Sequence, residues 1–341
     1  MPEKQPTKKQ HYVPQTYLRG FSPDSTYIYE YNLKQGKPIP EPVSIESICR
    51  EKFLYEFRDN DGEFIWINAL EEILGDIEGK FAEYKRRLLS KVVHKENYKT
   101  KSFLSTEERY FWRFYTTLQV MRMPSILSGI TEIMKDEFPK EFTENELRNI
   151  AIAFSLPFFK PPEQNELNAF LLFLSALDTR TLTVGFAESD NLFTSDQPMY
   201  GEKGAKDLTD IKALWFPISS NCILFYSPPR EGNNTKRNRL IPVSSDEVDA
   251  INKGIAYMAR NIVLSKHPFS EDDVEIIKQA RADREQDKAF YYVASLVNRK
   301  TFIEQDAPPT AALSWQVWHL VAQTPLVRGD PLIPCAKYVS S

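Results

Sequence analysis

An α+β fold with a mainly helical body is what the sequence predicts, and two observations support it. Between residues 64 and 92, apolar side chains recur at alternating steps of three and four, which is typical of a long amphipathic helix. Elsewhere, short runs rich in aromatic and β-branched residues are bounded by turn-forming residues, which indicates small antiparallel β-sheet elements. The contents of 42% hydrophobic and 26% charged residues exclude disordered and fibrous chains.

The N-terminal segment predicts a basic arm followed by a short helix. The first ten residues are polar, and we expect them to be mobile. After them, Pro14 suits the first turn of a helix, and Gly20 suits the position just past its end. His11 and Gln15 are four positions apart, so we expect both on one side of this turn.

Periodicity, capping residues and turn residues predict the remaining elements. Residues 26–32 and 41–45 flank a turn and predict a hairpin, to which residues 52–57 add a third strand. N-capping residues at 105–108 predict the start of a second long helix. Further helices are expected at 143–155, 163–179, 245–263, 270–281 and 285–298, and further strands at 182–187, 191–195, 213–218 and 221–226.

A change in composition divides the chain near residue 308. Residues 1–307 are expected to form one domain, whereas residues 308–341 contain few charged side chains. Two interpretations of this tail stay open. It is either a terminal helix around Trp315 and Trp318 that packs on the body or on another subunit, or a segment without a functional role.

The charge balance and the missing motifs exclude several classes of site. A net charge of −4 provides no overall basic field, so a site for a polyanion must be local. The sequence contains no Gly-rich phosphate loop, zincin motif or nucleophile elbow, and its four histidines form no short pair. Two Glu-x-Lys tripeptides, at 78–80 and 83–85, lie in the predicted long helix rather than on a strand, which argues against a metal-nuclease role for either.

Cysteine usage and the N-terminus predict a cytoplasmic protein. Cys49, Cys222 and Cys335 are too few and too dispersed for a disulfide framework. The N-terminus has no apolar leader, and the longest apolar runs are shorter than a membrane-spanning helix. We therefore expect neither secretion nor membrane insertion.

Arg122 breaks the local pattern of the second long helix. It falls among apolar residues, where a permanent positive charge needs an anionic partner. That partner is either an internal carboxylate or the phosphate or carboxylate of a ligand, with Gln119 as a neutral orienting group. Pro124 cannot donate a hydrogen bond to the carbonyl of Val120, so we expect a kink there.

Three further features are candidates for a site. Asp196 ends an apolar strand before a Gln-Pro break; it either caps that turn or serves as a general base, a magnesium ligand or the partner of the helical arginine. His11 is either a buried, hydrogen-bonded imidazole or an acid/base group. The loop at 230–239, with Arg237 and Arg239, has four basic residues and one acidic residue, a net charge of +3, and is either solvated or a phosphate-binding patch.

The run Gln10-His-Tyr-Val-Pro-Gln15, followed by Tyr17-Leu-Arg and Phe21, resembles the opening motif of the DUF4238 family, an uncharacterised bacterial group. The resemblance spans about residues 9–265 and continues, in the family's order, at 119–124, 193–198, 217–219, 252 and 259–263. Gln197 stands where the family usually has asparagine, which puts in doubt a role for that amide. Because the family brings no established activity, the resemblance groups residues without assigning chemistry.

If these segments converge, they form one polar pocket suited to a phosphodiester. We then expect His11, Arg122 and Asp196 as catalytic residues, and Gln15, Gln119, Tyr17, Arg237 and Arg239 as substrate-binding residues. The expected function is a cytoplasmic bacterial nuclease of a toxin or phage-defence type that binds nucleic acid or nucleotide, with Mg²⁺ as candidate cofactor. The alternatives are a nucleotide- or anion-binding sensor without turnover, and a structural protein that forms a homo-oligomer or binds a partner through its helices or tail.

Overall fold

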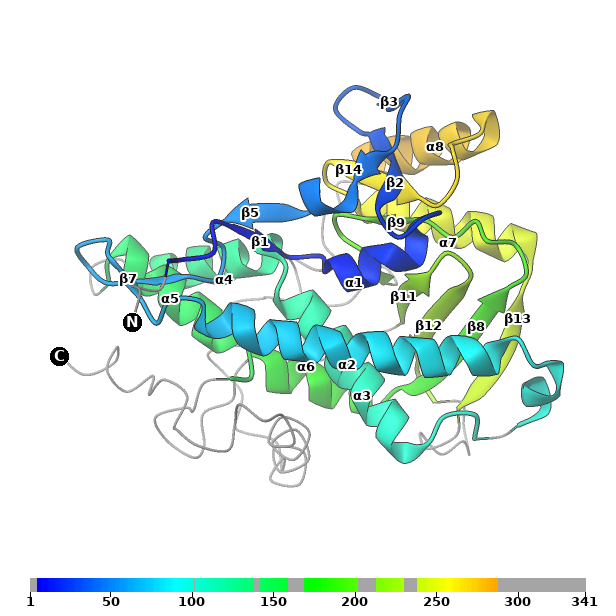
Figure 1. Ribbon diagram of the computed structural model, residues 1–341, viewed down its shortest axis with the longest axis horizontal. Helices are drawn as coiled ribbons and strands as arrows, with labels where there is room; N and C mark the ends of the chain where they lie inside the picture. The colour runs from blue at the N-terminus through cyan, green and yellow to red at the C-terminus, as the bar shows by residue number, and fades with distance from the viewer. Residues whose placement is uncertain are drawn as a thin grey trace.

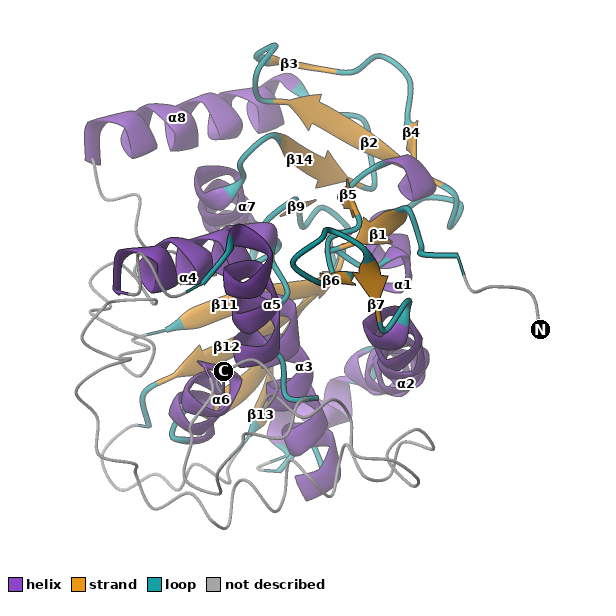
Figure 2. Ribbon diagram, turned by 90° about the vertical axis from the view of Figure 1, so that its left-hand side faces the viewer, coloured by secondary structure: helices purple, strands orange, loops and turns teal. Residues whose placement is uncertain are grey.

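The computed structural model describes residues 5–100, 102–137, 142–158, 169–201, 213–229 and 238–287, which form an α+β fold as the sequence predicts. Within these residues, two five-stranded sheets and two strand pairs combine with eight α-helices (Figures 1 and 2). The helices are α1 (Gln15–Leu18), α2 (Ala69–Val92), α3 (Thr106–Met121), α4 (Pro124–Glu137), α5 (Glu144–Ser155), α6 (Ala169–Asp178), α7 (Ser245–Met258) and α8 (Glu271–Asp287).

The first sheet has the strand order β10-β11-β12-β8-β13. Its strands are antiparallel except that β13 pairs in parallel with β8. Ser219 at the end of β11 is paired with Cys222 at the start of β12, and the strand predicted at 182–187 corresponds to β8. The bounds are β8 (Thr181–Ala187), β10 (Tyr200–Gly201), β11 (Leu214–Ser219), β12 (Cys222–Ser227) and β13 (Arg239–Val243).

One face of the first sheet is buried against α1 and α3. Phe216, Leu224, Val184 and Leu240 are paired in register across four strands, and none is more than 1% exposed. The ring of Phe216 stacks on that of Tyr17 in α1, with 5.4 Å between the centroids. Because side chains alternate along a strand, the neighbouring residues face the other side of the sheet.

The second sheet has the order β3-β2-β14-β9, and β4 also pairs with β2. The expected hairpin is therefore confirmed, with β2 at its centre. The predicted third strand is wrong, since β5 pairs with β1 instead and β6 pairs with β7. The bounds are β1 (Lys9–His11), β2 (Tyr27–Asn32), β3 (Lys37–Pro38), β4 (Val43–Ser44), β5 (Arg50–Lys52), β6 (Phe57–Arg58), β7 (Phe64–Ile65), β9 (Thr194–Ser195) and β14 (Ile262–Ser265).

Three predicted helix boundaries are corrected by strand pairing and backbone geometry. The long helix begins at Ala69 rather than Phe64, because Asn68 has a left-handed φ of 62° and the preceding residues form β7. Helix α7 ends at Met258, and residues 262–265 pair with β2 and β9 as β14. Pro124 begins a new helix rather than kinking the old one. The carbonyl of Val120 accepts a hydrogen bond from the backbone N–H of Met123.

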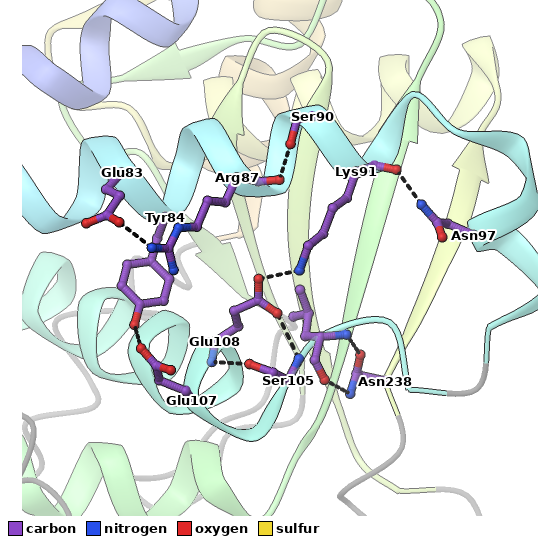
Figure 3. A network of polar contacts seen from close by, with 11 residues as sticks. Glu83, Tyr84, Arg87, Ser90, Lys91, Asn97, Ser105, Glu107, Glu108 and Asn238 are labelled. Carbon is purple, nitrogen blue, oxygen red and sulfur yellow. Dashed lines mark hydrogen bonds and ion pairs between the residues drawn. The ribbon is translucent and has the colours of Figure 1, made fainter.

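Helices α2 and α3 pack through aromatic rings and a polar junction (Figure 3). Ser105 caps α3 in a reciprocal capping box with Glu108, as the sequence predicts. Glu108 also forms an ion pair with Lys91 of α2. The side chain of Asn238 hydrogen-bonds both the N–H and the carbonyl of Leu104, so this junction also fixes the start of β13.

Several predictions lie outside the described residues. They include most of the helix expected at 285–298, of which α8 contains residues up to 287, and the whole of residues 308–341. The division into a domain of residues 1–307 and a tail therefore stays a prediction. Among the helices that the structure describes, none is both long and apolar enough to span a membrane.

Gly254 in α7 lies against the ring of Tyr200, where an added Cβ would be 2.6 Å from Cε2. We expect Gly254→Ala to destabilise the protein by about 1–3 kcal/mol, because the ring must move. Gly79 in α2 has nothing within 4 Å of an added Cβ and is exposed. Gly79→Ala should therefore stabilise the protein by up to about 1 kcal/mol. Urea unfolding measures both free energies. A midpoint of Gly254→Ala equal to that of the unchanged protein would contradict the close packing of Tyr200.

Candidate active site

Pairing of β1 with β5 places His11 directly opposite Arg50. The backbone continues the pairing beyond the strand, since the N–H of Tyr12 donates to the carbonyl of Cys49. His11 and Arg50 are both partly exposed. Neighbouring residues on antiparallel strands have side chains close enough to interact, so the imidazole and the guanidinium form one local site.

Within the described residues, the His11 ring is oriented by one backbone contact. Its Nε2 lies 3.2 Å from the carbonyl oxygen of Glu46, and a carbonyl only accepts, so Nε2 carries the hydrogen and donates it. In the neutral ring, Nδ1 is then the basic nitrogen. Burial lowers the pKa of His11 from its ordinary value, and the positive charges of Arg50 and Arg122 lower the pKa further against the opposing contact with Glu46. The ring is therefore mainly neutral at pH 7.

Arg50 is a partly exposed cation at the start of β5 that has no partner among the described residues. No described residue forms a hydrogen bond or ion pair with its guanidinium, although the group is close enough to His11 to act on its pKa. A guanidinium with free donors can bind a phosphate through two parallel hydrogen bonds. Sequence reasoning missed Arg50, because only strand register brings it opposite His11.

Arg122 is committed to the interior. Its side chain is 2% exposed, and Nη1 lies 3.1 Å from a carboxylate oxygen of Glu78 in α2. Nη2 donates to the carbonyl of His11 at 2.6 Å, and the hydroxyl of Tyr55 donates to the carbonyl of Arg122 itself at 2.7 Å. Of the two partners left open by the sequence, the structure has the internal carboxylate. Glu78 begins one of the two Glu-x-Lys tripeptides, so this ion pair explains the carboxylate without nuclease chemistry.

Gln119 supports the same backbone one residue further along. Its amide Nε2 donates to the carbonyl of Tyr12 at 2.8 Å. With Arg122 on the carbonyl of His11, the end of α3 thus holds two consecutive carbonyls of the N-terminal motif. Both side chains position the segment that carries His11.

Asp196 holds a turn in a distant part of the chain. One carboxylate oxygen accepts from the N–H of Arg260 at 2.8 Å, and the other accepts from the N–H and the side-chain amide of Asn261 at 2.8 and 3.0 Å. Asp196 is 3% exposed, and burial raises the pKa of its carboxyl while these hydrogen bonds oppose that shift. It therefore caps the connection between α7 and β14 rather than its own Gln-Pro turn.

Tyr12 and Cys49 link Asp196 to the segment of His11. The charge of Asp196 acts on the side chains of both Tyr12 and Cys49, which places the three groups near one another. Burial is the largest of the effects that raise the pKa of each of these two groups. The three expected catalytic residues thus lie on neighbouring segments. The polar atoms of Arg122 and Asp196, however, are hydrogen-bonded to other groups of the protein.

The expected substrate-binding residues are dispersed. Gln15 is partly exposed, and its side-chain oxygen accepts from Arg19 at 3.5 Å. Tyr17 is fully buried, and its hydroxyl contacts Thr194 and the carbonyl of Pro217, so it serves packing. Arg239 is exposed at the start of β13, the edge strand of the first five-stranded sheet. Arg237 lies outside the described residues. Among the residues described, no group of three or more metal-ligating side chains is gathered.

A family model with the description "Protein of unknown function (DUF4238)" matches residues 9–268. The chain belongs to the DUF4238 family. No curated protein and no solved structure matches it. The geometry gives a physical reason why the DUF4238 motif segments belong together. The segment at 119–124 holds the carbonyls of the opening motif, and Asp196 holds the backbone at 260–261.

Removing the buried guanidinium tests its positioning role. We expect Arg122→Ala to destabilise the protein by about 3–5 kcal/mol, because the partly buried Glu78 and the carbonyl of His11 both lose their partner. Arg86 on α2 is exposed, and Arg86→Ala should change the free energy of unfolding by less than about 0.5 kcal/mol. Urea denaturation followed by circular dichroism measures both. A small loss for Arg122→Ala, comparable with that of Arg86→Ala, would contradict the role.

Proposed function

We propose that this DUF4238 protein is a phosphodiester-cleaving enzyme, a nuclease of the bacterial cytoplasm that acts in a toxin or phage-defence role. The observation that supports it is the pairing of a neutral, partly exposed His11 with the cation of Arg50, which has no partner among the described residues. A general base needs a pKa below the working pH, and a phosphate needs a cation beside that base. Both conditions are met on one strand pair.

In the proposed reaction, Nδ1 of His11 accepts the proton of a water molecule or a ribose hydroxyl. The oxygen so activated attacks phosphorus, and the bond from phosphorus to the leaving oxygen breaks. Arg50 neutralises the negative charge that builds up on the phosphate oxygens. The leaving oxygen takes a proton from water, and the hydroxide that remains takes the proton from Nδ1 of His11, which restores the neutral ring. His11 and Arg50 are thus the proposed catalytic residues.

Arg122, Gln119 and Asp196 act as positioning residues in this proposal. Arg122 and Gln119 fix the backbone at His11 and Tyr12, and Asp196 fixes the turn beside them. The positive charge of Arg122 also contributes to the low pKa of His11. The cytoplasmic location is supported by the cysteines, since Cys49 and Cys222 are both free and buried.

The cleavage test uses the purified full chain with labelled RNA, single-stranded DNA and duplex DNA, each with Mg²⁺, with Mn²⁺ and with EDTA. We expect cleavage of at least one substrate and a loss of at least about 100-fold in His11→Gln, because a general base contributes that much or more. His94→Gln is the matched control, since that imidazole is 59% exposed and distant in sequence. Intact substrates in every condition, or full activity of His11→Gln, would refute the nuclease. Binding without cleavage would favour the anion-binding sensor instead.

The pH dependence of cleavage tests the role of Arg50. The neutral form of His11 is the active one, and its pKa lies below the ordinary 6.5. The rate should therefore increase as the pH is raised through the acidic range and be constant from about pH 7 upward. In Arg50→Gln, the loss of a positive charge should raise the pKa of His11, so the rising limb should move to higher pH while the maximal rate falls. An unmoved limb would show that Arg50 does not act on His11.

A further inference from the structure

A row of side chains crosses all five strands of the first sheet on the face opposite to the buried row. Tyr200 is opposite Trp215, Trp215 is opposite Phe225, and Phe225 is opposite Thr183. Thr183 is in turn opposite Arg239 on the parallel edge strand. The first four side chains are partly exposed, and Arg239 is exposed. This set is called the aromatic row below.

The three rings of the aromatic row form a continuous stack. Tyr200 and Trp215 have centroids 4.8 Å apart and planes 2° apart. Trp215 and Phe225 are also 4.8 Å apart, with planes 30° apart. Both faces of the indole thus contact a ring, whereas Phe225 contacts a ring on one face within the described part of the chain.

Both ends of the aromatic row are fixed by the fold. Tyr200 lies against the backbone of α7 at Gly254, which leaves no space for even one more carbon. At the other end, Asn238 is hydrogen-bonded on both sides to Leu104, which holds the residue next to Arg239 (Figure 3). The stack is therefore held against α7 at Tyr200, and its last ring is Phe225.

Thr183 is a small, partly exposed side chain that separates Phe225 from Arg239 in the aromatic row. Adjacent strands are about 4.8 Å apart, so Phe225 and Arg239 start from positions roughly two strand spacings apart, with only a threonine between them. A flat ring over Thr183 would contact Phe225 on one face and the Arg239 guanidinium on the other. The guanidinium of Arg239 makes no hydrogen bond or ion pair with a described residue.

We infer that the aromatic row is a base-stacking surface for single-stranded nucleic acid, with one base seated over Thr183. Bases stack on aromatic rings irrespective of sequence, and arginine stacks on base faces while attracting the phosphates. A duplex keeps its bases paired and stacked inside, so only a single strand can supply a free base. The inference rests on the proposed function, since it names the substrate class of the same enzyme.

The test measures binding in the His11→Gln background, so that no strand is cut. Fluorescence anisotropy follows a short fluorescein-labelled poly-dT or poly-rU strand and a duplex of equal length at low salt. The single strand should bind more tightly than the duplex. Thr183→Phe puts a ring where the base would lie, and Arg239→Gln removes the cation; each should weaken single-strand binding at least about fivefold.

Arg86→Gln is the matched control for Arg239→Gln, because it removes an exposed cation on α2, outside the aromatic row. It should bind the strand as the His11→Gln parent does. Unchanged binding in Thr183→Phe and Arg239→Gln, tighter duplex binding, or displacement by AMP as effective as by unlabelled strand would overturn the inference. If Thr183→Phe fails to fold, Arg239→Gln decides alone, since its side chain is exposed.

Failure of this inference can be told apart from failure of the proposed function. If the protein cuts a nucleic acid through His11 while the aromatic row variants bind normally, the nuclease stands and the row is not its binding surface. If the row binds single strands but the parent protein cuts none, the surface stands and the nuclease falls.

Discussion

The guanidinium of Arg122 is charged where almost no water reaches, and the N-terminal half of the structure depends on how that charge is compensated. Glu78 supplies the negative charge from α2, and the carbonyl of His11 takes a second donor. Such a pair is worth little against an apolar replacement, but the buried guanidinium without its carboxylate is costly. The ion pair therefore acts as a constraint that forces α2, α3 and the opening motif into one arrangement.

Asp196 imposes a comparable constraint on the other side of the opening motif. Its carboxylate satisfies the backbone N–H groups of Arg260 and Asn261, while Arg281 donates to the carbonyl of Ala259 in the same turn. The turn between α7 and β14 is thus held through both its donors and its acceptor. The polar residues that break the local pattern thus hold the surrounding backbone in place, and the partly exposed His11 and Arg50 lie on the backbone that they hold.

Side chains alternate between the two faces of the first sheet, so that one face packs in the core and the other carries the proposed binding surface. The row through Phe216 is buried against α1 and α3, and the row through Trp215 faces the other way. The tight contact between Gly254 and Tyr200 restricts movement of the first ring of the stack. A stack of rings that is already ordered loses little conformational entropy when it takes up another flat group, which favours recognition of bases by shape rather than by sequence.

The sequence by itself determined the fold class, the long helix, the capping box at Ser105 and the need of Arg122 for an anion, because periodicity, caps and buried charge are local properties. It also grouped the motif segments of the family. Only the tertiary structure decided that the anion is Glu78 and that Arg50 stands opposite His11. Those contacts join residues far apart in the chain, and strand register and helix packing, which no local pattern encodes, bring them together.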